Sequence, residues 1–223
     1  MKTYKIHFIR HGQTDGNKQG RFVGSTDVSI NEEGKENLMI LLDRFGYPTV
    51  GRLYTSPLKR CRETASILYP EHPQIVLDDL REYNFGDFEN KTYAELAGNP
   101  EFDKWVQTAT VGSIPNGEDG HSFVERCRKG FEGLLMDMMK GGITSAACIT
   151  HGGIIMTLMA LFDCEQLPKT AYMVDNGTGF TVLLTPSLWM RSQIFEIYSR
   201  IPNPQGEGFS LEKYFTAKHN EIH

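Results

Sequence analysis

Short apolar runs alternate with longer segments of helical periodicity along this chain. The runs at residues 6–9, 52–55, 74–77, 145–149, 179–184 and 192–198 have the length of β-strands. Apolar residues recur at helical spacing after Ser29, after Ser56-Pro57, and across residues 122–140 and 154–162. We expect Ser29 to cap the first of these helices, which Gly46 ends, and Ser56-Pro57 to cap and open the second.

This alternation is typical of an α/β fold. It predicts a three-layer sandwich, in which a mostly parallel central sheet has helices on both faces. Only a short link at Pro186-Ser187 separates the last two strands, which predicts an antiparallel edge. Residues 79–115 are irregular apart from helical pieces at about 93–97 and 102–109, as in a lid or another functional insertion. The expected organisation is one domain over residues 1–200, with this insertion, and a C-terminal tail over residues 201–223.

One segment has the length of a membrane span. Residues 143–162 contain no Asp, Glu, Lys or Arg. His151-Gly152-Gly153 interrupts the segment in its middle, so a buried strand, a turn and a buried helix account for it better. We therefore expect no membrane partner.

The composition narrows the classes of partner. The chain has 223 residues and a net charge of -5, so it has no basic excess with which to bind nucleic acid. A small phosphorylated substrate needs only a local cationic pocket. The 4 cysteines form no CxxC pair, which favours free thiols in a reducing compartment over a disulfide framework or a zinc site. Lys2 and Lys5 interrupt any apolar leader, and we expect a cytoplasmic protein.

Charged side chains follow several predicted strands where each strand ends. Arg10-His11-Gly12 follows the first strand, Arg60 lies in the helix after the second, Glu82 follows the third and His151 the fourth. Taken alone, Arg10-His11-Gly12 is compatible with a plain polar turn. In a parallel sheet, however, the carboxyl ends of the strands share one edge, so these side chains are expected to converge. Guanidinium groups match phosphate oxygens, an unprotonated histidine can attack phosphorus, and a carboxylic acid can protonate a leaving oxygen.

The order and spacing of these motifs resemble the histidine phosphatase superfamily, also called the phosphoglycerate mutase-like family. Arg10-His11-Gly12-Gln13-Thr14 with Asn17 is similar to the N-terminal signature of that family. Further segments match in order at residues 24–34, 55–65, 80–89, 115–126 and 149–153, so the resemblance covers most of the chain. The departures from the family pattern are Ser29, Ile30, Asn90 and Asp119. They leave the expected catalytic residues intact and put only loop geometry and substrate fit in doubt.

The resemblance implies a role for each residue of the set. His11 would be the nucleophile that forms a phosphohistidine, and Glu82 would give the leaving group a proton and then help to activate water. The residues implied to bind the phosphoryl group are Arg10, Asn17, Arg60, His151 and Gly152. The family uses no metal and no cofactor for this chemistry, so none is expected here.

The expected function is that of a histidine acid-type phosphatase from the phosphatase branch of the family. It would be a metal-independent phosphomonoesterase that acts on a small phosphorylated metabolite. A cofactor-dependent phosphoglycerate mutase would use the same residues and is the alternative, although the modest insertion and Gly153-Ile154 favour the phosphatase. An inactive binding module is disfavoured because all the expected catalytic groups are present. The substrate and the choice between monomer and homodimer stay open. The role of four aromatic residues also stays open, because they either line the pocket or pack in the core: Phe22, Tyr83, Phe85 and Phe88.

Overall fold

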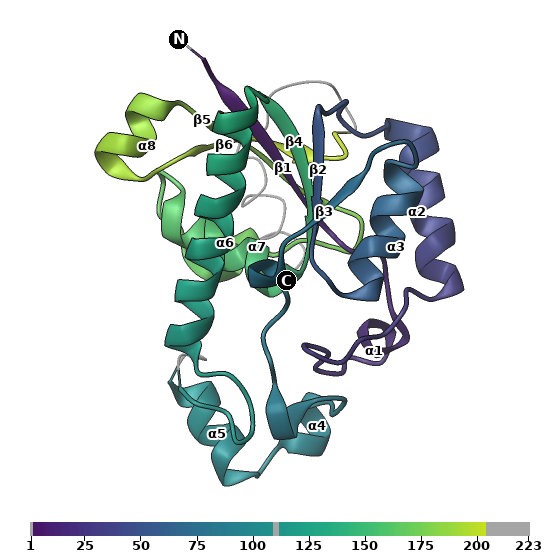
Figure 1. Ribbon diagram of the computed structural model, residues 1–223. Helices are drawn as coiled ribbons and strands as arrows, with labels where there is room; N and C mark the ends of the chain where they lie inside the picture. Colours follow the sequence, from purple (N-terminus) through teal and green to yellow (C-terminus); the bar gives the residue numbers. More distant parts are fainter. Residues whose placement is uncertain (1, 109–111, 204–223) are drawn as a thin grey trace, which may run out of the picture.

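The structure is a computed structural model that describes residues 2–108 and 112–203 (Figure 1). The strands are β1 (Tyr4–Arg10), β2 (Arg52–Thr55), β3 (Gln74–Val76), β4 (Ser145–Thr150), β5 (Gly179–Leu184) and β6 (Glu196–Ile201). The α-helices are α1 (Asp15–Lys18), α2 (Glu32–Phe45), α3 (Lys59–Leu68), α4 (Tyr93–Leu96), α5 (Pro100–Gln107), α6 (Gly120–Gly141), α7 (Gly152–Phe162) and α8 (Pro186–Ser192). Three 3-10 turns are η1 (Asp78–Leu80), η2 (Gly86–Phe88) and η3 (Lys169–Tyr172).

The strands form one mixed sheet in the order β3-β2-β4-β1-β5-β6. β1 pairs with β4, β4 with β2, and β2 with β3, each time in parallel. β5 is antiparallel to β1, and β6 is antiparallel to β5. The predicted α/β architecture is therefore confirmed, including the antiparallel pair of the last two strands, β5 and β6, at one edge of the sheet.

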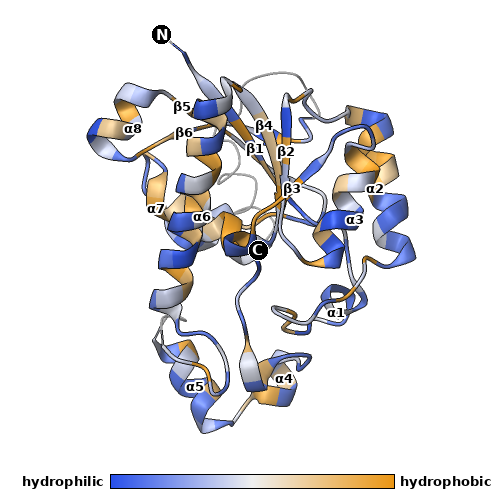
Figure 2. Ribbon diagram, viewed as in Figure 1, coloured by the Kyte–Doolittle hydropathy of each residue, from blue (hydrophilic) through white to orange (hydrophobic). Residues whose placement is uncertain are grey.

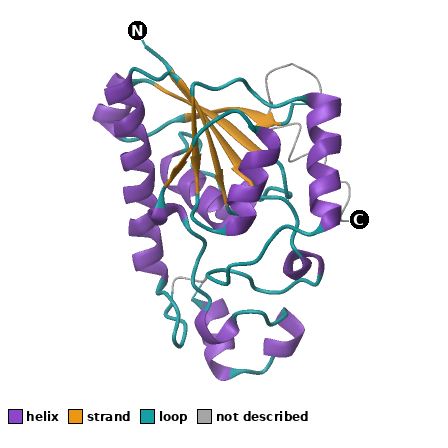
Figure 3. Cartoon of the chain, turned by 45° about the vertical axis from the view of Figure 1, so that its right-hand side comes forward, coloured by secondary structure: helices purple, strands orange, loops and turns teal. Residues whose placement is uncertain are grey.

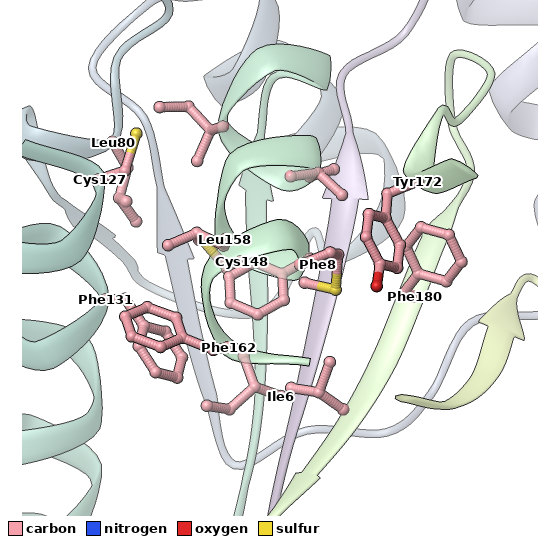
Figure 4. Close-up of a cluster of buried hydrophobic side chains, with 14 of the residues drawn as sticks. Ile6, Phe8, Leu80, Cys127, Phe131, Cys148, Leu158, Phe162, Tyr172 and Phe180 are labelled. Carbon is pink, nitrogen blue, oxygen red and sulfur yellow. The ribbon is translucent and has the colours of Figure 1, made fainter. Parts of the chain in front are cut away.

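Helices cover both faces of the sheet (Figure 3). Successive residues of a strand point to opposite faces, so each buried strand packs against both helix layers. Ile6 and Phe8 of β1 belong to the larger buried cluster, which includes Phe131 of α6 and Leu158 of α7 (Figure 4). Ile9 belongs to a second buried cluster with residues of α2 and α3. Figure 2 shows hydrophilic and hydrophobic residues mixed along α2, α3 and α6, and α2 exposes several large hydrophobic side chains, among them Met39 and Ile40. β1, and with it the residues that follow it, is thus held between two packed layers.

The first long helix, α2, begins two residues later than expected. Asn31, not Ser29, is its N-cap, and Asn31 Oδ1 accepts a hydrogen bond from the Gly34 N–H at 2.7 Å. A Cβ at position 34 would lie 2.4 Å from the carbonyl oxygen of Gln13, so this glycine lets the helix approach the loop after β1. Gly46 ends α2 with a φ of 68°, as expected.

Helix α3 begins at Lys59, with Leu58 as its N-cap, rather than at Pro57. Ser56, which was expected to help open this helix, has another partner. Its hydroxyl lies 2.7 Å from Nε2 of His151, which follows β4. Ser56 Oγ also accepts a hydrogen bond from the Leu58 N–H at 3.4 Å, but it does not cap α3, which starts one residue later.

The link at Pro186-Ser187 is part of a helix, α8, which Thr185 caps through a 3.3 Å hydrogen bond from the Leu188 N–H. β6 therefore begins at Glu196 and continues to Ile201, one residue into the segment expected to be a tail. Of that expected tail, residues 204–223 lie outside the described residues.

The insertion at residues 79–115 contains the two short helices expected there, α4 and α5. Figure 1 shows both beyond the carboxyl ends of β1, β2 and β4, on the same side as α1. Position 109, where the second helical piece was expected to end, lies outside the described residues. Across residues 2–108 and 112–203, no helix is both long enough and apolar enough to cross a bilayer.

Candidate active site

Neighbouring parallel strands end at the same level and bring two histidines together. Arg10 at the end of β1 is in register with Thr150 at the end of β4. His11 and His151 are the next residues along each strand. Their ring centroids lie 5.2 Å apart, with an angle of 64° between the ring planes. The predicted convergence of the two histidines is thus a direct result of strand register.

His11 is in the tautomer and charge state of a nucleophile. The side chain is only 4% exposed, and its Nδ1 lies 2.7 Å from the carbonyl oxygen of Gly12. A carbonyl oxygen only accepts, so Nδ1 carries the proton and Nε2 keeps its lone pair. Burial, together with the charges of Arg60 and Arg10, holds the pKa of His11 well below its usual value, and the ring is neutral near pH 7.

Arg10 and Asn17 supply hydrogen-bond donors beside His11. Arg10 Nη1 donates to the carbonyl oxygen of Val174 at 2.8 Å, whereas its buried Nε has no partner among the described residues. Asn17 Oδ1 accepts from a backbone N–H at 3.1 Å and from Asn176 Nδ2 at 3.3 Å. This orientation leaves the Asn17 Nδ2 group as a donor. Both side chains line the same cavity as His11 and can bind an anion there.

Glu82 is held at the N-terminus of α7. It is 9% exposed, and its Oε2 accepts from the Gly153 N–H at 3.0 Å while Oε1 accepts from the Tyr83 N–H at 2.9 Å. A Cβ at position 153 would lie 2.4 Å from Oε1, so a glycine is needed there for the carboxylate to occupy this place. Glu82 thus reaches the cavity from the side of the insertion.

These residues line one cavity of about 250 Å³. Its polar part consists of Arg10, His11, Asn17, Glu82, Gly152 and Gly153, and the other lining residues are Arg21, Phe22, Val23, Phe85, Met156, Met173 and Val174. Of the four aromatic residues whose role was open, Phe22 and Phe85 line the pocket, whereas Tyr83 and Phe88 are buried in the core. A larger cavity, of about 340 Å³ and lined in part by Lys5 and His7, contains none of the predicted site residues.

Arg60 does not line the cavity. It is fully buried, and its Nη1 and Nη2 donate to the carbonyl oxygens of Thr26 and Gly24 at 2.8 and 2.6 Å. Its Nε donates to His151 Nδ1 at 3.3 Å. These bonds use three of the five guanidinium N–H groups, so two remain as donors.

His151 lies beside His11 but does not line the cavity, and it is fully buried. Because its Nδ1 accepts from Arg60, its Nε2 carries the proton and donates to Ser56 Oγ at 2.7 Å. Burial, followed by the charge of Arg60, lowers the pKa of His151 well below its usual value. His151 is therefore a neutral ring in this structure, bonded on both nitrogens.

Glu89 organises the loop that holds Arg60. Its carboxylate accepts from the backbone N–H groups of Gly24 and Ser25, at 3.1 and 2.8 Å, and from the Thr26 hydroxyl at 2.6 Å. The carbonyl oxygens of Gly24 and Thr26 are the acceptors of Arg60. Glu89 falls within a motif that resembles the family, but nothing in the sequence indicates this link to Arg60.

Asn176 was not predicted at all. Its Nδ2 donates to the carbonyl oxygen of His11 at 2.9 Å and reaches Asn17 Oδ1. It lies in the loop before β5, where no periodicity or motif marks it. Among the described residues, no group of His, Cys, Asp or Glu side chains is arranged to hold a metal ion.

Comparisons with known proteins find relatives of the chain in sequence and in fold. The family model described as histidine phosphatase superfamily (branch 1) matches residues 6–186. A probable phosphatase of Schizosaccharomyces pombe is 39% identical over 184 residues, which cover 79% of this chain and 77% of that protein. A probable phosphoglycerate mutase of Serratia proteamaculans is 28% identical over 82% of this chain and 97% of that protein. In fold, the chain is similar to the crystal structure of a putative alpha-ribazole-5'-P phosphatase from Escherichia coli, with a TM-score of 0.72, 20% identity, and coverage of 87% of this chain and 94% of the other.

Proposed function

The chain belongs to the histidine phosphatase superfamily, and on that premise we propose that it is a metal-independent phosphomonoesterase that hydrolyses a small phosphorylated metabolite. The main support is the state of His11, a neutral ring with its Nδ1 proton held by the Gly12 carbonyl. Nε2 is thereby left as a nucleophile in a cavity that Arg10, Asn17 and Glu82 also line.

In the first step, His11 Nε2 attacks phosphorus, and the bond from phosphorus to the alcohol oxygen breaks. Glu82, in its protonated form, transfers its proton to that oxygen, and the alcohol leaves. The product is a phosphohistidine, whose positive ring is stabilised because Nδ1–H donates to the Gly12 carbonyl at 2.7 Å. Arg10 and Asn17 donate hydrogen bonds to the phosphoryl oxygens as charge shifts in the transition state.

In the second step, the Glu82 carboxylate takes a proton from a water molecule as the water oxygen attacks phosphorus. The bond from phosphorus to Nε2 breaks, inorganic phosphate leaves, and the electron pair returns to His11. Direct contact of Arg60 and His151 with the phosphoryl group stays a prediction from the family resemblance. The two remaining N–H groups of Arg60 are compatible with such a contact, and its buried charge already acts on His11.

A cofactor-dependent phosphoglycerate mutase is the second candidate, because it would use the same residues and one relative is named a probable phosphoglycerate mutase. In a mutase, the phosphohistidine returns its phosphoryl group to a sugar acid rather than to water. The two functions therefore differ in the fate of one intermediate.

The test is release of inorganic phosphate from a panel of phosphomonoesters in the presence of EDTA. We expect wild-type protein to be active, His11→Ala to be inactive, and His121→Ala, which alters an exposed histidine outside the cavity, to match the wild type. Protein quenched during turnover should carry an acid-labile phosphate. Activity that needs added metal, or that survives in His11→Ala, refutes the proposal, and interconversion of phosphoglycerates with little free phosphate favours the mutase.

A further inference from the structure

The part of the cavity beyond the phosphoryl-binding residues indicates which alcohol is released, provided that the proposed phosphatase function holds. We propose that the substrate is a phosphomonoester whose alcohol part is apolar and carries no charge.

The charged side chains that line the cavity are Arg10, Arg21 and Glu82. Arg10 and Glu82 serve the phosphoryl group and the leaving oxygen in the proposed reaction. Only Arg21 is left to bind a second anionic group, such as the carboxylate of a phosphorylated amino acid or sugar acid.

Arg21 is already bonded to acceptors of the protein itself. Its Nε donates to Gln19 Oε1 at 2.7 Å, and its Nη1 donates to the carbonyl oxygen of Asn90 and, at 3.0 Å, to Glu95 Oε2. Glu95 balances the charge of the guanidinium, and the same carboxylate oxygen accepts from the Thr92 N–H at 2.7 Å. Among the described residues these bonds use Nε and Nη1, so a substrate carboxylate at Arg21 would have only the Nη2 N–H groups as donors and would lie close to the Glu95 carboxylate.

The rest of the wall is apolar and comes from four different parts of the chain. It consists of Phe22, Val23, Phe85, Met156, Met173 and Val174. The rings of Phe22 and Phe85 lie 5.2 Å apart, and Phe22 also packs against Trp105 at 6.0 Å, so this surface is fixed by its own packing. A carboxylate placed here would lose its water without gaining a donor, whereas an alkyl or aryl group gains contact.

The decisive measurement compares kcat/KM for benzyl phosphate and 2-phenylethyl phosphate with kcat/KM for phosphoserine and 3-phosphoglycerate. All four release a primary alcohol, so the comparison reports mainly on the body of the substrate. We expect the two aryl-alkyl phosphates to exceed the two carboxylates by about tenfold or more.

One variant changes the wall at an exposed position, and a second variant outside the cavity is its control. Met173 is 53% exposed, so Met173→Lys adds a cation to the wall without opening the core. It should raise kcat/KM for phosphoserine relative to benzyl phosphate by about tenfold. Met190, which is 85% exposed on α8 and lies outside the cavity, supplies the control Met190→Lys, which should leave the ratio unchanged.

The outcomes separate this inference from the proposed function. If neither these four esters nor the wider panel of phosphomonoesters is hydrolysed in a His11-dependent manner, both proposals fail. If His11-dependent hydrolysis favours phosphoserine or 3-phosphoglycerate, the phosphatase stands and the apolar substrate is wrong. A selective loss of activity on the carboxylate substrates in Arg21→Gln would overturn the inference in the same way, because it would make Arg21 the carboxylate-binding residue.

Discussion

Glu118 and Arg126 form a buried ion pair that is attached to the backbone around Glu82. Arg126 Nε and Nη2 donate to the two carboxylate oxygens of Glu118 at 2.8 and 2.7 Å. Arg126 Nη1 donates to the carbonyl oxygens of Asp79 and Arg81 at 2.9 and 2.7 Å, and Nη2 reaches the Glu82 carbonyl at 3.3 Å. We therefore expect this pair to position the proton donor, although neither residue lines the cavity.

The perturbation is Glu118→Gln, which keeps the shape of the side chain and removes its charge. The side chains of Arg126 and Glu118 are 8% and 14% exposed, so the guanidinium would be left buried without its counter-ion. We expect the free energy of unfolding to fall by about 3 kcal/mol, the lower end of the range for a broken buried pair. Urea unfolding measures this loss.

A second assay distinguishes positioning of Glu82 from a general loss of stability. p-Nitrophenyl phosphate has a leaving group that needs little protonation, whereas benzyl phosphate releases an alkoxide that must be protonated. Under conditions where Glu118→Gln stays folded, kcat/KM for benzyl phosphate should fall about 100-fold, the scale of general-acid catalysis. The value for p-nitrophenyl phosphate should stay within about threefold of the wild type, since its transition state gains little from the acid.

The matched control is Asp137→Asn, which removes the carboxylate of the Arg52–Asp137 pair. Those side chains are 26% and 48% exposed, so we expect a loss of less than about 1 kcal/mol and no change in the ratio of the two substrates. Equal losses on both substrates in Glu118→Gln would refute the reasoning, because they would show that the pair acts on the whole site rather than on Glu82.

Three further predictions follow from single contacts. Burial, with the charge of Lys5, lowers the pKa of His7 to about 4, so the unfolded state takes up the proton first as the pH falls below 6.5. About 3 kcal/mol of stability, present above pH 6.5, should be lost by pH 4, and His7→Asn should flatten this part of the stability–pH curve. Gly153→Ala should displace the Glu82 carboxylate and lower kcat at least about 100-fold. In the control Gly133→Ala, the added Cβ meets nothing within 4 Å, so the thermal midpoint should rise slightly. Asn176→Ala should lower kcat/KM about tenfold with little change in thermal midpoint, since it removes the donor to the His11 carbonyl.

The α/β alternation and the order of the catalytic motifs were determined by the sequence alone. Strand and helix periodicities are local, so β2 and β5 appear at the predicted residues. The convergence of His11 and His151 also followed from sequence, because parallel strands place the residues after their carboxyl ends on one edge.

Which hydrogen bonds form among these residues was decided only by the tertiary structure. Ser56 stands where the sequence predicts a helix cap, yet its hydroxyl is bonded to His151, 95 positions away. Arg60 is bonded to loop carbonyls that Glu89 holds in place, so it lies behind the cavity instead of in its wall. Asn176 reaches His11 from 165 positions away. A polar side chain has several possible partners of similar strength, and the packed fold, not the local sequence, determines which of them comes within hydrogen-bonding distance.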